Sequence, residues 1–415
     1  MPNKSDLNTV SDCKGFNDLL KDVVNPGLCT VCGTCAGVCP RQAIEMRIED
    51  YETGEPFPAL IGKCKPCSAC YEACAGKSVP LADLDRFVFG RERNPEEEPL
   101  GIFRRCIKGY GEGRLRVGSS SGGVTLGVVA HALEEGLIDA ALVAVRSKEH
   151  PWRAEPGIIT SAKDARRGVR SVMEAVPVNA ALHEAVIKMG YRKIGVVGLP
   201  CQIHSLRKLQ QRGKPKRLAD AVVFSIGLYC NSTAYYIGIE HLIKEIGGIE
   251  SLKEIIGMDY RAGDWPGSMM VVMDDGKIYN IAGKAFYGSF LSIASYRRDR
   301  CLMCTDFSAE LADISVGDIF QSVGDNRRWS GAIVRTTIGE KLIDGALTRG
   351  FIHVESHNPE LVPASGYGWE MSKHANMYRL MERKEHGWPV PDFQYPSFIK
   401  LLRRNILSSS SAKKD

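Results

Sequence analysis

Two runs of cysteines near the amino terminus have the spacing of ligands to iron–sulfur clusters. Both runs have the form Cys-x-x-Cys-x-x-Cys-x-x-x-Cys, and the second begins 35 residues after the first: Cys29, Cys32, Cys35 and Cys39, then Cys64, Cys67, Cys70 and Cys74. Three cysteines at this spacing can surround one face of a [4Fe–4S] cube, while amides of the loop donate hydrogen bonds to its sulfurs. The spacing therefore predicts two [4Fe–4S] clusters.

The fourth cysteine of each run is expected to bind the cluster of the other run, as in bacterial-type ferredoxins with two clusters. One cluster is then bound by Cys29, Cys32, Cys35 and Cys74, and the other by Cys64, Cys67, Cys70 and Cys39. Zinc is the alternative metal for thiolates, but zinc sites usually close with two Cys-x-x-Cys pairs. Pro40 follows Cys39 whereas Ala75 follows Cys74, so the two loops need not close in the same way.

Four further cysteines are candidates for a third metal site: Cys201, Cys230, Cys301 and Cys304. Cys201 and Cys230 each follow a segment with the pattern of a buried strand. If those strands are parallel neighbours, the two cysteines meet at the carboxyl edge of a sheet, where α/β proteins build their sites. A third [4Fe–4S] cluster is one interpretation. A zinc or redox role for the Cys301–Cys304 pair and unreactive buried thiols at Cys201 and Cys230 are the others.

Two cysteines have no partner at ligand spacing. Cys13 is predicted to be an isolated thiol, and Cys106 is unassigned.

A run of small residues, 119–123 (Ser-Ser-Ser-Gly-Gly), precedes a predicted helix at 125–135. Small residues let the backbone approach a phosphate, and the amino terminus of a helix carries partial positive charge. The run therefore predicts an anion site, with an ordinary helix cap as the alternative.

The elements that must position these residues alternate between strands and helices from about residue 100. This alternation predicts an α/β domain with a largely parallel or mixed sheet. Strands are expected at 138–145, 193–198, 221–228, 313–317, 331–336 and 351–355, helices at 125–135, 162–169, 180–189, 199–211, 234–246 and 339–348, and a hairpin at 271–281.

The chain is expected to have three parts. Residues 1–95 form an α+β ferredoxin-like domain with two clusters and short strands at 44–48 and 57–61, followed by a charged linker at 92–99. Residues 96–358 form the α/β domain with the third cysteine site. Residues 359–415 form an irregular extension that ends in a disordered tail.

The composition is that of an ordinary globular protein, with 44% hydrophobic and 25% charged residues among 415. The net charge of +5 comes without a basic run or an aromatic-interleaved patch, so nucleic-acid binding is not expected. No run of 18 apolar residues is present, so no membrane span is expected. Cysteines at cluster spacing, without a signal peptide, indicate the reducing cytoplasm.

Several short segments together resemble the beta-subunit family of coenzyme F420-reducing hydrogenases and F420-linked dehydrogenases. They occur in the family's order: residues 121–125 (SGGVT), 198–202 (GLPCQ), 261–267 (RAGDWPG), and 300–306 (RCLMCTD) continuing to 312–318 (ADISVGD). With the ferredoxin-like unit attached, the layout is similar to that of the longer members, which include beta subunits of F420-dependent formate dehydrogenases.

The resemblance implies two sites in the α/β domain. FAD would bind with its phosphates near the small-residue run, and the candidate contacts are Ser120, Ser121, Gly122, Gly123, Thr125, Arg170, Gly198 and Pro200. The third [4Fe–4S] cluster would be held by Cys201, Cys230, Cys301 and Cys304. Reduced coenzyme F420 would pass a hydride to the flavin, so no side-chain acid, base or nucleophile is expected.

The resemblance also implies a role in a complex. The chain would exchange single electrons through its clusters with a catalytic subunit of formate dehydrogenase, hydrogenase or heterodisulfide reductase type, or with ferredoxin. One alternative is a ferredoxin-fed flavin enzyme that reduces another conjugated substrate, as in the related chlorophyll-pigment reductase. The other is a pure electron-transfer subunit without flavin.

Overall fold

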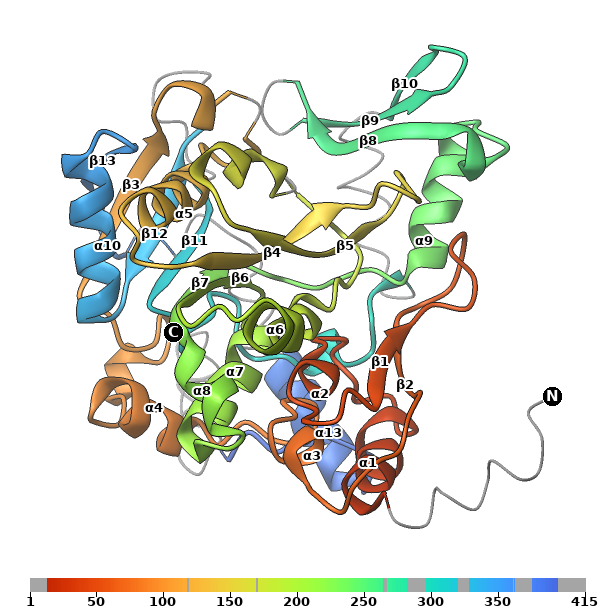
Figure 1. Ribbon diagram of the computed structural model, residues 1–415, viewed down its shortest axis with the longest axis vertical. Helices are drawn as coiled ribbons and strands as arrows, with labels where there is room; N and C mark the ends of the chain where they lie inside the picture. Colours follow the sequence, from red (N-terminus) through yellow and green to blue (C-terminus); the bar gives the residue numbers. More distant parts are fainter. Residues whose placement is uncertain are drawn as a thin grey trace, which may run out of the picture.

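An eight-stranded mixed sheet lies at the centre of the protein (Figure 1). The computed structural model describes residues 13–117, 119–168, 171–263, 267–281, 296–319, 328–360, 362 and 375–394. From edge to edge, the strands are β13 (Ile352–Ser356), β3 (Arg105–Gly111), β12 (Ser330–Val334), β11 (Ile314–Asp318), β7 (Val222–Leu228), β6 (Ile194–Gly198), β4 (Ala140–Arg146) and β5 (Ala154–Ile159). Strands β11, β7, β6 and β4 are parallel, and the others pair antiparallel, which confirms the predicted mixed sheet.

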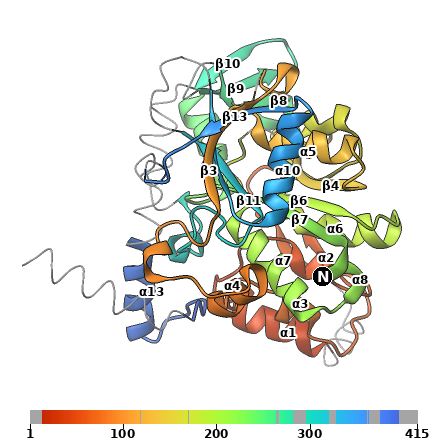
Figure 2. The same cartoon turned by 90° about the vertical axis from the view of Figure 1, so that its left-hand side faces the viewer.

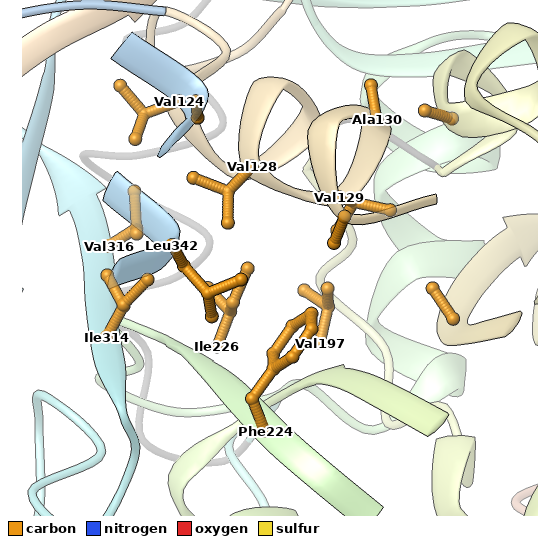
Figure 3. Packing of buried hydrophobic residues seen from close by; sticks show 14 of the residues in the cluster. Val124, Val128, Val129, Ala130, Val197, Phe224, Ile226, Ile314, Val316 and Leu342 are labelled. Carbon is orange, nitrogen blue, oxygen red and sulfur yellow. The ribbon is translucent and has the colours of Figure 1, made fainter. Parts of the chain in front are cut away.

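Helices cover both faces of this sheet. One face packs against α5 (Val124–Glu134) and α10 (Thr337–Thr348), which lie side by side in Figure 2. Figure 3 shows α5 pointing Val128 and Val129 towards Phe224 and Ile226 of β7. The other face packs against a group of helices: η6 (Val178–Ala180), α6 (Ala181–His183), η7 (Glu184–Lys188), α7 (Pro200–Arg212) and α8 (Lys216–Ala221).

A smaller antiparallel sheet extends from the main body beside α9 (Figure 1). Its strands are β8 (Ile255–Ala262), β9 (Ser268–Met273) and β10 (Ile278–Ile281). The predicted hairpin is the β9–β10 pair. Helix α9 (Tyr236–His241) and the π-helical turn η8 (Leu242–Ile246) pack on the β8–β9 side of this sheet.

The cysteine-rich module, residues 13–79, packs beneath the main sheet. Its elements are α1 (Lys14–Leu19), η2 (Leu20–Val24), α2 (Thr34–Gly37), the antiparallel strands β1 (Ile44–Arg47) and β2 (Phe57–Leu60), and α3 (Ala69–Glu72). Helix α2 approaches the backbone before α6 so closely that a Cβ at Gly37 would lie 1.9 Å from the Asn179 carbonyl oxygen. The module and the α/β part therefore share one packed interface.

Several elements differ from the expectations. Strand β5 contains Pro156 and Gly157, which argue against a strand, but it lies at an edge of the sheet, where proline is tolerated. Strands β3 and β8 and helix α4 (Leu81–Phe89) were not predicted. The remaining short helices are η3 (Pro95–Glu97), η4 (Gly113–Leu115), η5 (Ala162–Arg167), η9 (Leu252–Glu254) and η12 (Cys301–Met303).

Two predicted irregular segments are ordered by tertiary contacts. The expected linker at 92–99 contains η3, and the side chain of Arg93 is buried between Asp85 and Glu310. The expected irregular extension contains α13 (Asn376–Glu385), which packs into the core of the cysteine-rich module. The predicted tail at 408–415 lies outside the described residues. The boundaries at residues 95 and 358 stay predictions.

None of the helices in the described parts of the chain is long and apolar enough to cross a membrane.

Candidate functional site

Four cysteines of the module surround a small apolar cavity. This second set is Cys39, Cys64, Cys67 and Cys70, and the wall is completed by Pro40, Arg41, Ile44, Lys65 and Ala69. Burial raises the pKa of Cys70 to about 12, and the neighbouring sulfurs of Cys67 and Cys39 add to the shift. Crowded thiols of this kind become thiolates when a metal supplies positive charge. Four soft donors around one volume fit a [4Fe–4S] cluster.

The first set, Cys29, Cys32, Cys35 and Cys74, lies next to the second. Burial raises the pKa of Cys29 to about 12, with Cys74 and then Cys32 adding to it. The Val31 amide donates to Cys29 Sγ at 3.4 Å, as loop amides do around clusters. The structure thus brings Cys74 to the first run of cysteines and Cys39 to the second, which is the exchange that the repeat predicts.

The third set, Cys201, Cys230, Cys301 and Cys304, lies at the carboxyl edge of the main sheet. Cys201 is in the first turn of α7 directly after β6, and Cys230 follows β7. These strands are parallel neighbours, with Gly198 paired to Gly227. Burial raises the pKa of Cys230 well above its usual value, with further increases from Cys301, Cys201 and Cys304. All four sulfurs therefore lie close to one another, and Cys201 and Cys230 meet as the strand pattern suggested.

The three sets form a row. Cys70 of the second set is near enough to Cys35 of the first to contribute to its raised pKa. Cys32 of the first set is the sulfur with the largest effect on the pKa of Cys201 of the third. Within the described residues, no three His, Cys, Asp or Glu side chains are close enough to share one metal ion.

A cavity of about 410 Å³ lies beside the third set of cysteines. Its volume is within the usual range for ligand pockets. Cys230 is part of its wall, together with the predicted cofactor contacts Ser120, Ser121, Gly123, Thr125 and Gly198. Gly122 and Pro200 are direct neighbours of wall residues, and Arg170 lies outside the described residues.

The loop at 119–123 is shaped by glycines and held by its neighbours. Gly122 and Gly123 have φ of +98° and +95°, and a Cβ at Gly123 would lie 2.4 Å from the Leu115 carbonyl oxygen. Arg328 donates to the carbonyl oxygens of Ser119 and Ser120 at 3.2 and 3.0 Å. The loop leads into α5, and the amino terminus of a helix carries partial positive charge, so the site suits a phosphate.

The cavity wall also contains charged groups that the sequence interpretation did not single out as site residues. Glu174 is buried and accepts hydrogen bonds from the Tyr260 hydroxyl at 2.7 Å and the Ala154 amide at 2.9 Å. Arg261 pairs with Asp318 at 2.6 Å. Arg261 lies within a segment that carried the family resemblance, whereas no local pattern marked Glu174.

Three further residues connect the cysteine sets to distant parts of the chain. Asn376 of α13 donates to the carbonyl oxygens of Cys301 and Cys304, at 3.3 and 2.8 Å. Glu55, between β1 and β2, accepts from the Tyr236 amide and from Arg298. The prediction of an isolated thiol at Cys13 was wrong, because Cys13 is buried and hydrogen bonded with Cys64.

Known protein families match successive parts of this chain. Residues 109–183 and 191–360 match the family described as coenzyme F420 hydrogenase/dehydrogenase, beta subunit, in its N-terminal part and its C terminus respectively. Residues 22–45 match the 4Fe-4S binding domain, and this range contains Cys29, Cys32, Cys35 and Cys39.

Individual relatives cover most of the chain. A subunit of the F(420)H(2) dehydrogenase of Methanosarcina mazei is 31% identical over 337 residues, 78% of this chain and 84% of that protein. The beta subunit of the coenzyme F420 hydrogenase of Methanothermobacter thermautotrophicus is 29% identical over 297 residues, 70% of this chain and 99% of that protein.

The fold has a solved counterpart. A chain in the xenon-derivatized F420-reducing [NiFe] hydrogenase complex of Methanosarcina barkeri aligns with a TM-score of 0.57 and 24% identity, covering 73% of this chain and 99% of that chain. The extent and identity of the sequence matches show that the chain belongs to the coenzyme F420 hydrogenase/dehydrogenase beta-subunit family.

Proposed function

We propose that this chain is an iron–sulfur flavoprotein subunit that passes electrons between coenzyme F420 and a partner enzyme. The observation that carries the proposal is the row of three cysteine sets. It starts at the exposed Cys67 and ends at the cavity beside Cys230. A row of clusters of this kind carries electrons. A partner protein must therefore donate or accept electrons at one end of the row. The names of the relatives, a hydrogenase and a dehydrogenase, support F420 as the coenzyme.

Each set would hold one [4Fe–4S] cluster, and the cavity would hold FAD. The glycine–serine loop and the first turn of α5 would bind the phosphates through backbone amides and the hydroxyls of Ser120, Ser121 and Thr125. Gly122, Gly198, Pro200 and Arg170 remain proposed contacts. FAD, when bound, supplies the exchange of a hydride for single electrons. The protein's part is to bind and orient the flavin and to exclude water.

The test is anaerobic mixing of the flavin-loaded full chain with reduced coenzyme F420. We expect rapid bleaching of the visible flavin absorbance together with formation of oxidised coenzyme. Flavin that stays oxidised, yet is reducible by dithionite, would contradict F420 as the hydride partner and favour reduction of another conjugated substrate. A chain that assembles its clusters but binds no flavin would favour a pure electron-transfer subunit.

Gly123→Ala should weaken FAD binding by at least about tenfold. A left-handed backbone costs a non-glycine residue about 1–2 kcal/mol, and the new Cβ would also press on the Leu115 carbonyl, so the loop must leave its phosphate-binding shape. The measurement is the dissociation constant of FAD from flavin fluorescence. Gly136→Ala is the matched control, because Gly136 has φ of +64° just beyond the other end of α5 and nothing within 4 Å of its Cβ. Equal losses in both variants would contradict the role of the loop.

A further inference from the structure

Helix α7 carries residues of two cysteine sites on one face. Cys201 of the third set lies in the first turn of the helix, and Ser205 and Lys208 follow at positions i+4 and i+7, one and two turns later. Both reach the first set. Ser205 is fully buried and Lys208 is 8% exposed, so their polar groups are directed into the protein.

The hydroxyl groups of Ser205 and Thr34 flank the sulfur of Cys32. We call these two residues the hydroxyl pair. The Ser205 oxygen is 3.5 Å and the Thr34 oxygen 3.3 Å from Cys32 Sγ. Cys32 itself is 7% exposed. Two buried hydroxyl groups therefore lie against a buried sulfur of the first set.

Each of the two hydroxyl oxygens also accepts a hydrogen bond from a group other than Cys32. The Ala75 amide donates to Ser205 Oγ at 3.1 Å, and a backbone N–H can only donate. The Asn179 side-chain amide donates to Thr34 Oγ1 at 2.8 Å and to the Gln202 carbonyl at 3.0 Å, which fixes that atom as the nitrogen. The Ser205 hydroxyl can therefore turn its proton towards Cys32. As a thiol, Cys32 donates to Thr34 Oγ1, but a cluster-bound thiolate has no proton, so only the two hydroxyls can then donate to its sulfur.

Lys208 places a cation beside another cysteine of the same set. Its ammonium group donates to the carbonyl oxygens of Cys74 and Ser78 at 2.5 and 2.8 Å, and lies 3.2 Å from the Ser78 hydroxyl. The Lys208 ammonium group therefore places a positive charge directly beside the first set.

Hydrogen bonds and nearby charge control the reduction potentials of iron–sulfur sites. Reduction adds a negative charge that the ligand sulfurs share. O–H donors and an ammonium group stabilise that charge, more strongly in a buried site than in water. We propose that the hydroxyl pair and Lys208 raise the reduction potential of the cluster at the first set; this inference rests on the proposed function. Ser205 and Lys208 belong to the α/β part of the chain. The reduction potential of the cluster at the first set, in the middle of the row, would therefore depend on packing against the α/β part and not only on the cysteine motif.

The experiment is a redox titration of the reconstituted full chain, followed by low-temperature electron paramagnetic resonance. The variants are Ser205→Ala, Thr34→Val and Lys208→Met. The titration of the parent protein should show three components, one for each cluster. Each variant should lower the reduction potential of the same component, that of the first set, and leave the other two potentials unchanged. At a fixed potential, we expect the ratio of reduced to oxidised cluster to fall roughly three- to tenfold for each lost hydroxyl. The double hydroxyl variant should shift further than either single one.

Ser225→Ala is the control, since Ser225 is an equally buried hydroxyl that contacts Asp313 rather than a cysteine. It should move no component. Unchanged potentials in Ser205→Ala and Lys208→Met, or equal shifts of all three components, would overturn the inference. If the Thr34→Val variant does not assemble the cluster at the first set, the Ser205→Ala and Lys208→Met variants alone test the inference. A parent protein with only two components would count against the third cluster of the proposed function, while the shift of the first would still be measurable.

Discussion

Cys301→Ala should reduce the iron content from about twelve to about eight atoms per chain, because one of three four-iron clusters would lose a ligand. Among the neighbouring sulfurs, Cys301 has the largest effect on the pKa of Cys230, so these two cysteines of the third set lie close together. The measurement is iron per chain after anaerobic reconstitution. Cys106→Ala is the matched control, since Cys106 is also a buried thiol but lies in a separate apolar cluster with Leu100 and Ile333. Equal iron content in Cys301→Ala and the parent would contradict the third cluster.

The Cys301→Ala variant also tests whether electrons must pass through the third set to reach the other two. Reduced coenzyme F420 should still bleach the flavin, since the glycine–serine loop is unchanged. The signals of the two clusters in the cysteine-rich module should then fail to appear on the time scale seen in the parent protein, although dithionite still produces them. Normal reduction of these clusters by the coenzyme would show that electrons bypass the third set.

Arg93→Ala should destabilise the protein by about 3–5 kcal/mol, the usual cost of removing one partner from a buried ion pair. Arg93 binds Asp85 with two hydrogen bonds of 2.7 and 3.0 Å and also pairs with Glu310. Both carboxylate side chains are 1% exposed, so the substitution would leave two buried negative charges without their cation. Since 1 kcal/mol shifts the melting temperature of a large domain by about 2 °C, we expect melting about 5–10 °C lower.

Arg86→Ala is the matched control for this prediction. Arg86 also pairs with two carboxylates, Asp83 and Glu92, but all three side chains are about half exposed, so water replaces the lost contacts. We expect a change below about 1 kcal/mol. Arg93→Lys should lie between the two, because it keeps the charge and loses the two-pronged geometry. Similar melting temperatures for Arg93→Ala and Arg86→Ala would show that the segment at 92–99 is the loose linker that its composition suggested.

The segments predicted well are those whose signal is local. The two runs of cysteines predicted which thiols would gather, because the ligands of one cluster loop lie within a few residues of one another. The ends of β6 and β7 predicted that Cys201 and Cys230 would meet, because parallel strands that neighbour each other end at the same edge. The hairpin of β9 and β10 follows from the turn residues at 274–276.

The segments predicted poorly are ordered by partners far away in the chain. Strand β5 forms despite Pro156 because its residues pair along β4 at an edge of the sheet. Arg93 is in a charged, proline-bearing stretch. It becomes a buried ion-pair partner only because Glu310, from a distant part of the chain, packs against it. Asn376 contacts the carbonyl oxygens of Cys301 and Cys304 from a segment that had no periodic pattern strong enough to predict α13.

The sequence by itself therefore determined the chemistry of this protein: which thiols form the sets, which small residues form the loop before α5, and which family the chain resembles. Only the tertiary structure decided the order of the sets in a row, the cavity beside Cys230, and the contacts of Ser205 and Lys208 with the first set. The physical reason is that ligand spacing is encoded within a loop. The environment of a sulfur depends instead on helices and strands that pack against it from elsewhere in the chain.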